Sequence, residues 1–238
     1  YLAAIVSVAL GLFSFSLPKT PPKATNESPS VREILGLDAL KLLNDSRYLI
    51  FFISSILICI PLAFYYQDAN LFLNELGMKN AAGVMTLGQI SEALFILLLP
   101  IFLNKYGIKK TLIVGMFAWS LRYVLFAFGD TGSNIWMLIF GIVLHGICYD
   151  FFFVSGQIYT DFKAGEKYKS AAQGLIALAT YGLGMLIGFR LAGRVTDQFA
   201  LDPGHDWTQI WIIPAIFAAV VLVIFILTFK NEKIEIEK

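Results

Sequence analysis

The sequence of 238 residues carries a formal net charge of +1, is 58% hydrophobic and 15% charged, and has a mean hydropathy of +0.72. A soluble domain is typically about half apolar and about a quarter charged, so this composition excludes an ordinary soluble protein and indicates a polytopic membrane protein. With only two cysteines and two histidines, a disulfide framework and a histidine-rich metal site are excluded, and we expect no cofactor.

Windows of about 19–20 apolar residues locate the predicted membrane spans. The first span is short for a complete crossing and does not begin with Met, so we expect the chain to start part-way into a longer protein. In the sixth span, Gly184 and Gly188 form a GxxxG pattern, for which close helix packing is the favoured interpretation. The predicted spans cover residues 1–17, 47–69, 81–103, 110–128, 135–160, 170–198 and 208–229.

Residues 18–46 interrupt the apolar pattern and predict a connector. Its first part, PKTPPKATNESPS, is rich in Pro and Ser, and the following SVREILGLDALKLL has the periodicity of an amphipathic helix. Ser30 and Glu33 have the spacing of a capping box at the start of that helix. We predict a helix near residues 30–44 along the membrane surface; an ordinary solvated helix is the alternative.

Basic residues are sorted to one side of the predicted membrane, which sets the topology. The opposite loops hold only Lys79, beside the acidic segments GDTGSN and ALDPGHDW. Basic residues mark cytoplasmic loops, so we predict that the linker and the tail, residues 230–238, are cytoplasmic and that residue 1 is outside. The linker side carries Lys19, Lys23, Arg32, Lys41, Arg47, Lys105, Lys109, Lys110, Lys163, Lys167, Lys169, Lys230, Lys233 and Lys238.

Three spans carry polar side chains where the hydrocarbon core is expected. A carboxylate there costs about 2.5–3.5 kcal/mol on insertion scales, so such groups usually face a cavity, a proton path or a substrate. Two pairs are spaced i, i+3 and one pair i, i+4, so each pair shares a helix face. The candidate site residues are Gln67, Asn70, Gln89, Glu92, His145, Tyr149 and Asp150.

This set of side chains suits a polar, flat solute. Amides both donate and accept hydrogen bonds, carboxylates accept from hydroxyls and can take a proton, and aromatic rings offer a stacking face. The alternative for the amides is polar contact between helices. Asp68 either lines the same cavity or marks the outer end of its helix, and Arg122 is interpreted as a snorkelling residue or part of a structural ion pair.

The loop sequence LPIFLNKYGIKKTLIVG resembles the signature loop of the major facilitator superfamily, with Asn104 and Lys105 at its acidic and basic positions. One span, a linker and six spans are similar to the end of an N-terminal half followed by a complete C-terminal half. The resemblance implies an all-α membrane protein with a six-helix bundle at 47–229. It also implies a substrate site at the midplane, against an N-terminal half that lies outside this chain.

The strings GQISEALFILLLPIFLNKYGIKK, CYDFFFVSGQIY and KSAAQG resemble the nucleoside:proton symporter family, a branch of that superfamily. The resemblance implies proton-coupled nucleoside uptake across the inner membrane. It also implies that the candidate residues line the nucleoside site, with His145 standing where the family has Tyr and Tyr149 where it has Phe. Of the two buried acids, Asp150 is our candidate proton carrier and Glu92 our candidate acceptor for the nucleoside, with the reverse assignment left open.

Other functions fit the sequence less well. A facilitator for another polar solute, such as a sugar, is the alternative within the class. A retinal-type receptor needs a mid-span lysine, which no span contains, and Ser155 and His145 are about 15 Å apart along one helix, too far for a catalytic pair. Walker, dinucleotide-binding and nucleic-acid-binding motifs are absent from the sequence, so neither an enzyme nor a nucleic-acid partner is predicted.

Overall fold

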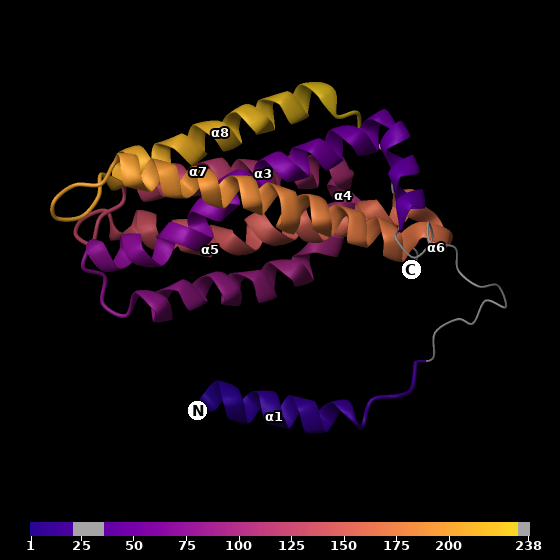
Figure 1. Cartoon of the computed structure of the whole chain (residues 1–238), viewed down its shortest axis with the longest axis horizontal. Coiled ribbons are helices and arrows are strands. Elements are labelled where there is room, and N and C mark those ends of the chain that lie inside the picture. Colours follow the sequence, from indigo (N-terminus) through magenta and orange to yellow (C-terminus); the bar gives the residue numbers. More distant parts are fainter. Residues whose placement is uncertain (21–35, 233–238) are drawn as a thin grey trace.

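A computed structural model describes residues 1–20 and 36–232, and they are almost entirely helical (Figure 1). Two π-helical segments interrupt the bundle: η2 (Tyr149–Val154) joins α5 to α6, and η3 (Leu178–Gly184) joins α6 to α7. The helices of the bundle are α3 (Ser46–Glu75), α4 (Ala81–Phe128), α5 (Ile135–Cys148), α6 (Ser155–Ala177), α7 (Met185–Gln198) and α8 (Trp207–Thr228).

Among the described residues, five helical stretches are long and apolar enough to cross a membrane, and the longest is Ala81–Phe128, with 48 residues. A straight helix of 48 residues would be about 72 Å long, more than twice the thickness of the hydrocarbon core. Gly107 breaks α4 with φ 75° and ψ 172°, and Gly165 breaks α6 with φ 60° and ψ 177°. Both are left-handed positions that glycine adopts without a steric penalty. Divided at Gly107, α4 gives two apolar segments, so the described residues after 45 contain six apolar segments that match the six predicted spans.

The first helix and the linker differ from the bundle. The helix α1 (Leu2–Ser14) stands apart from the other helices, and its described side chains are exposed (Figure 1). The predicted capping residues Ser30 and Glu33 lie outside the described residues. Residues Leu37–Asn44 form a 3₁₀ helix, η1, and not the predicted α-helix. Its Ala39 is fully buried against Ala164 and Ala172, so η1 packs on α6. Its position along the membrane surface stays a prediction.

The core is aromatic where α3, α4 and α8 meet. The rings of Tyr123 and Trp211 stack at 5.7 Å between centroids, and Phe72 contacts Trp211 edge-on at 5.3 Å. The Tyr123 hydroxyl donates to the carbonyl of Pro61 at 2.5 Å, which ties α4 to the proline turn of α3. These large rings fix how α3 and α4 cross, and this crossing places the polar residues of both helices.

The GxxxG pattern packs α7 against α3, which confirms the packing interpretation. A Cβ atom on Gly184 would lie 2.7 Å from the Cβ of Cys59, and one on Gly188 would lie 2.6 Å from that of Ala63. Only a hydrogen at each position allows the two helices to approach this closely.

One end of the bundle is tied together by ion pairs between the linker, α6 and the tail. Lys163 is 2.7 Å from Asp45 and 2.6 Å from Glu232, and Arg47 is 3.2 Å from Glu232. The hydrogen bond from Lys163 holds the pKa of the Asp45 carboxyl below its usual value. At the opposite end, Glu75 accepts hydrogen bonds from His205 and Trp207.

Candidate functional site

Side chains from α3, α4, α5 and η2 line an open cavity of about 370 Å³, which we call the central cavity. That volume falls within the range of about 300–1,000 Å³ that is usual for small-molecule sites. The cavity is lined by Tyr65, Tyr66, Met85, Gln89, Glu92, His145 and Tyr149.

Close backbone contact between α4 and α5 brings Gln89 and Glu92 of α4 beside His145 of α5. A Cβ atom on Gly146 would lie 2.6 Å from the Ser91 backbone, and one on Gly88 would lie 3.2 Å from the Cβ of His145. The Gly146 amide donates to the Ser91 hydroxyl at 3.0 Å. Because Gln89 and Glu92 flank this contact, their side chains emerge next to His145.

Four of the seven predicted residues line this cavity, and Asn70 lies at its edge. Its Nδ2 atom is 3.7 Å from the sulfur of the lining Met85. Gln67 is exposed and donates to Asp68 at 3.3 Å, and it is not among the residues that line the cavity. Asp68 itself is buried and accepts from Thr196 of α7 at 3.1 Å, so its role is to join α3 to α7.

Asp150 lies within the π-helical segment η2 and is completely buried. Neither of its carboxylate oxygens has a hydrogen-bond donor among the described residues. The Asp150 carbonyl accepts a backbone N–H at the end of η2 and also the Ser155 hydroxyl at 3.3 Å, so the backbone of this residue is satisfied while its side chain is not. Single π-helical turns within α-helices occur frequently at functional sites, and a buried carboxylate without a partner calls for a functional explanation.

Aromatic rings form a column along the cavity wall. The imidazole of His145 stacks on Tyr65 at 5.5 Å and on Tyr149 at 6.0 Å between centroids, with interplanar angles of 28° and 29°. At the end of the column, the hydroxyls of Tyr149 and Tyr181 are 2.8 Å apart. The sequence pattern did not single out Tyr65, Tyr66 or Tyr181, although Tyr66 and Asn70 have the i, i+4 spacing of a shared helix face.

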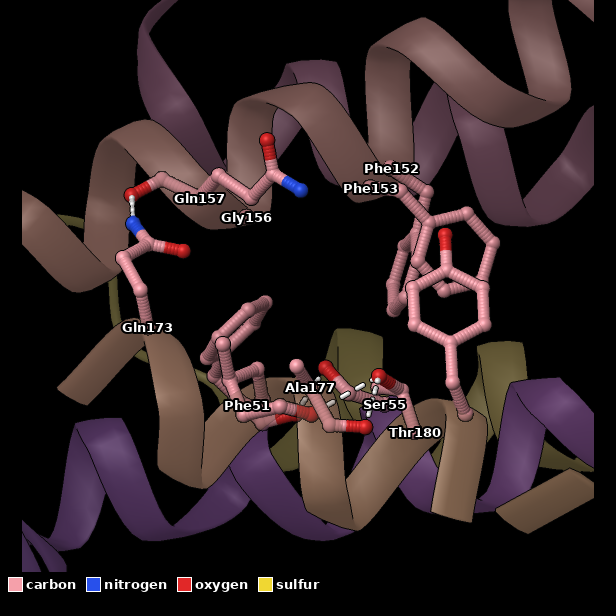
Figure 2. Close-up of a pocket in the computed structure, with 11 residues that line it drawn as sticks. Phe51, Ser55, Phe152, Phe153, Gly156, Gln157, Gln173, Ala177 and Thr180 are labelled. Carbon is pink, nitrogen blue, oxygen red and sulfur yellow. Dashed lines mark hydrogen bonds between the residues drawn. The ribbon is translucent and has the colours of Figure 1, made fainter. Parts of the chain in front are cut away.

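Figure 2 shows a second, smaller cavity. Its lining includes Tyr181 and, from the first part of α3, Phe51 and Ser55. Figure 2 shows Gln157 and Gln173 facing one another on one side of it, with the amide of Gln173 donating to the Gln157 carbonyl at 2.8 Å. Rings of Phe51, Phe152 and Phe153 form much of the remaining wall. Amides and aromatic rings therefore recur along the axis of the bundle.

Arg122 departs from both sequence interpretations. It is fully buried in the second half of α4, so it does not snorkel, and it forms no ion pair with a carboxylate among the described residues. Its Nη1 lies 3.1 Å from Nδ1 of His145, whose Nε2 is 3.6 Å from Glu92. A buried arginine is thus one side chain removed from the cavity.

The sequence profile of the nucleoside H+ symporter family matches residues 1–234. This chain belongs to that family. The nucleoside H+ symporter family is one of transporters and not of enzymes, which excludes the enzyme alternative, and the predicted all-α facilitator fold is confirmed by the structural comparison below.

The chain is 44% identical to YegT of Escherichia coli (strain K12), whose name describes it as a candidate nucleoside transporter, over 97% of this chain and 56% of YegT. It is 32% identical to the nucleoside permease NupG of the same organism over 99% of this chain and 59% of NupG. A crystal structure of a NupG mutant superposes with a TM-score of 0.82 over 97% of this chain and 60% of NupG. The chain therefore spans a little over half the length of these relatives.

Proposed function

We propose that this chain is the C-terminal part of a secondary transporter that carries nucleosides together with protons across the cytoplasmic membrane. The observation that supports this most directly is the central cavity, where Gln89 and Glu92 face the stacked rings of His145 and Tyr149. Membership of the nucleoside H+ symporter family supports the same substrate and the same coupling ion.

The chemistry of the lining suits a nucleoside. The Gln89 amide can donate to and accept from the mixed edge of a base, and the Glu92 carboxylate can accept from ribose hydroxyls. The exposed faces of Tyr149 and Tyr66 offer surfaces on which a flat base can stack. Asn70, at the rim, and Gln67, on the same face of α3, would contact the part of the substrate nearest the other half of the transporter.

A coupling ion needs an acid whose protonation depends on the state of the site. Asp150 is buried without a partner, beside the cavity, and Glu92 lines the cavity itself. We infer that Asp150 carries the proton and that Glu92 accepts from the substrate. If the roles are reversed, Glu92→Gln, and not Asp150→Asn, should abolish accumulation driven by a proton gradient.

The proposed orientation places the linker and the tail in the cytoplasm. Arg47 and Lys163 lie at the end of the bundle where α3 begins, and Lys109, which bonds to the Ile226 carbonyl near the end of α8, belongs to the same end. A lipid bilayer surrounds the apolar helices in this proposal, and an N-terminal half, present in the longer relatives, would close the cavity.

The proposal is tested by uptake into liposomes that contain the full-length protein. Labelled uridine and adenosine should accumulate when the outside is acidic, and a protonophore or unlabelled nucleoside should abolish accumulation, whereas excess glucose should not. Accumulation of labelled sugar without nucleoside transport would favour the other facilitator function. Accumulation that a protonophore does not affect would reject proton coupling.

A further inference from the structure

A permanently charged side chain lies fully buried in the second half of α4. Arg122 is among the largest side chains with no exposed surface, and its Nε and Nη2 atoms have no hydrogen-bond partner among the described residues. A guanidinium does not lose its proton in proteins. Because a buried charge is costly in a membrane protein, such charges usually have a function.

The contacts that Arg122 does make lead toward the cavity. The carbon of its guanidinium lies 3.4 Å from the centroid of the Tyr65 ring, a close cation–π contact. Its Nη1 atom is 3.1 Å from Nδ1 of His145. Both partners line the central cavity, so Arg122 supports the wall of the site from behind.

The chemistry of the arginine fixes the state of the histidine. A guanidinium only donates hydrogen bonds, so Nδ1 of His145 must accept with its lone pair. The single ring proton is therefore on Nε2, and this atom is 3.6 Å from Oε2 of Glu92. Stacking on Tyr65 and Tyr149 holds the ring in this orientation. Among the described residues, Arg122 and Glu92 from α4, Tyr65 from α3 and Tyr149 from η2 contact the imidazole, and Tyr66 of α3 lines the same cavity.

We propose that Arg122 is a positioning residue of the nucleoside site: it holds His145 as the Nε2–H tautomer, which directs an N–H group at Glu92 and orients that carboxylate toward the substrate. The identity of the ligand rests on the proposed function, whereas the geometry of the three side chains does not. His205 provides an internal contrast, because its Nδ1 lies 2.9 Å from a carboxylate oxygen of Glu75 and so must carry a proton.

The tautomers can be read directly from the full-length protein in liposomes, labelled with ¹⁵N-histidine and examined by solid-state NMR at neutral pH. Signals that vanish in His145→Gln and in His205→Gln assign the two rings. We expect a protonated Nε2 and a hydrogen-bonded, unprotonated Nδ1 for His145, and a protonated Nδ1 for His205. In Arg122→Met, His145 should become a mixture of tautomers. A wild-type His145 protonated on Nδ1, or a spectrum unchanged by Arg122→Met, would overturn the proposal.

Uridine affinity provides the second readout. Arg122→Met should weaken binding about tenfold or more, but in a His145→Phe background it should change affinity less than twofold, because the link to Glu92 is already broken. If Arg122→Met does not fold, Arg122→Lys serves in the same cycle. Lys is a point charge without the planar fork, so a smaller loss is expected, about two- to fivefold, which also disappears in the His145→Phe background. Losses that add in full would show that the two residues act separately and would reject the positioning role.

The two readouts separate this inference from the proposed function. If NMR shows the predicted tautomers but the protein binds neither uridine nor adenosine, the nucleoside assignment is rejected. The role of Arg122 in orienting Glu92 would then still stand. Tight uridine binding that Arg122→Met leaves unchanged would reject the inference and leave the proposed function standing.

Discussion

The two candidate acids of the site, Glu92 and Asp150, differ in their surroundings, and this difference sets their expected roles. The Glu92 side chain is 35% exposed in the cavity and has His145 nearby, whereas Asp150 is fully buried and neither carboxylate oxygen has a partner among the described residues. A group that must gain and lose a proton benefits from isolation, while a group that binds a hydroxyl must reach the cavity.

Replacement of Asp150 by Asn should therefore separate transport from its driving force. Asn cannot be protonated, so Asp150→Asn in the full-length protein should abolish accumulation driven by a proton gradient and retain exchange of labelled for unlabelled uridine. Uptake and exchange in the same liposomes measure both. If Asp150→Asn still accumulates uridine and Glu92→Gln does not, the two roles are reversed.

The cavity distinguishes between two glutamines that the sequence treated alike. Loss of a hydrogen-bond partner for a buried group costs about 1–3 kcal/mol, so Gln89→Ala should weaken uridine binding about tenfold or more. Gln67 does not line the cavity, and Gln67→Ala should have a smaller effect in the same binding assay. Equal losses would show that the N-terminal half of the transporter brings Gln67 into the site.

At the scale of elements, the two π-helical segments face each other across the cavity region. Tyr149 begins η2 and Tyr181 lies in η3, and their hydroxyls meet between the central and the second cavity. A π-helical turn contains an extra residue and so shifts the faces of the helix on either side of it. Tyr149, at the start of η2, stays on the cavity-facing side of α5, and the neighbouring Asp150 is buried within the π-helical turn.

The contact between α3 and α7 should be sensitive to a single methyl group. Gly188→Ala would force a Cβ to within 2.6 Å of Ala63, and overpacking of this kind costs about 1–3 kcal/mol. Gly174→Ala is the matched control, since nothing lies within 4 Å of its added Cβ. Thermal unfolding of the full-length variants should show a lower midpoint for Gly188→Ala only. A midpoint unchanged in both would mean that the helices separate at little cost.

The ion pairs at the linker end should stabilise the bundle in a pH-dependent way. Because the pKa of folded Asp45 is lowered, its contribution is present above the unfolded value of about 3.9 and is lost as pH falls through the folded value. Asp45→Asn keeps an N-cap acceptor for α3 and removes only the charge.

At pH 7 this variant should lose less than about 1 kcal/mol, since the Asp45 side chain is 41% exposed. In thermal unfolding, the difference from wild type should shrink as the pH falls below about 3.9 and disappear below the pKa of the folded protein. The exposed Glu166→Gln serves as the control. A destabilisation of Asp45→Asn that does not change with pH would contradict an electrostatic origin.

At the scale of the whole molecule, the charge distribution predicts the orientation in the membrane. Lys79 and Lys110 are both exposed and lie at opposite ends of the bundle. In a cysteine-free full-length background, Lys79→Cys should react with an impermeant maleimide in intact cells, and Lys110→Cys only after the membrane is opened. Labelling of both from the same side would reject the proposed topology.

Hydropathy alone located the apolar helices of the bundle, because the thickness of the bilayer fixes the length of an apolar helix. The break at Gly107 was expected for a similar reason, since a basic, glycine-containing loop separates two apolar runs. Helical spacing also predicted that Gln89 and Glu92 share a face. Each of these properties depends on residues that are close together in the sequence.

Only the tertiary structure decided which of these faces meet. Arg122 and His145 are 23 residues apart and touch because α4 and α5 pack at their glycines. Gln67 turns toward Asp68, Asp68 is held by Thr196, and the π-helical turn at Asp150 shifts the register of a helix whose sequence reads as regular. Helix crossings and backbone register result from the packing of many side chains at once, so the partners of a buried charge are not encoded by its neighbours in the sequence.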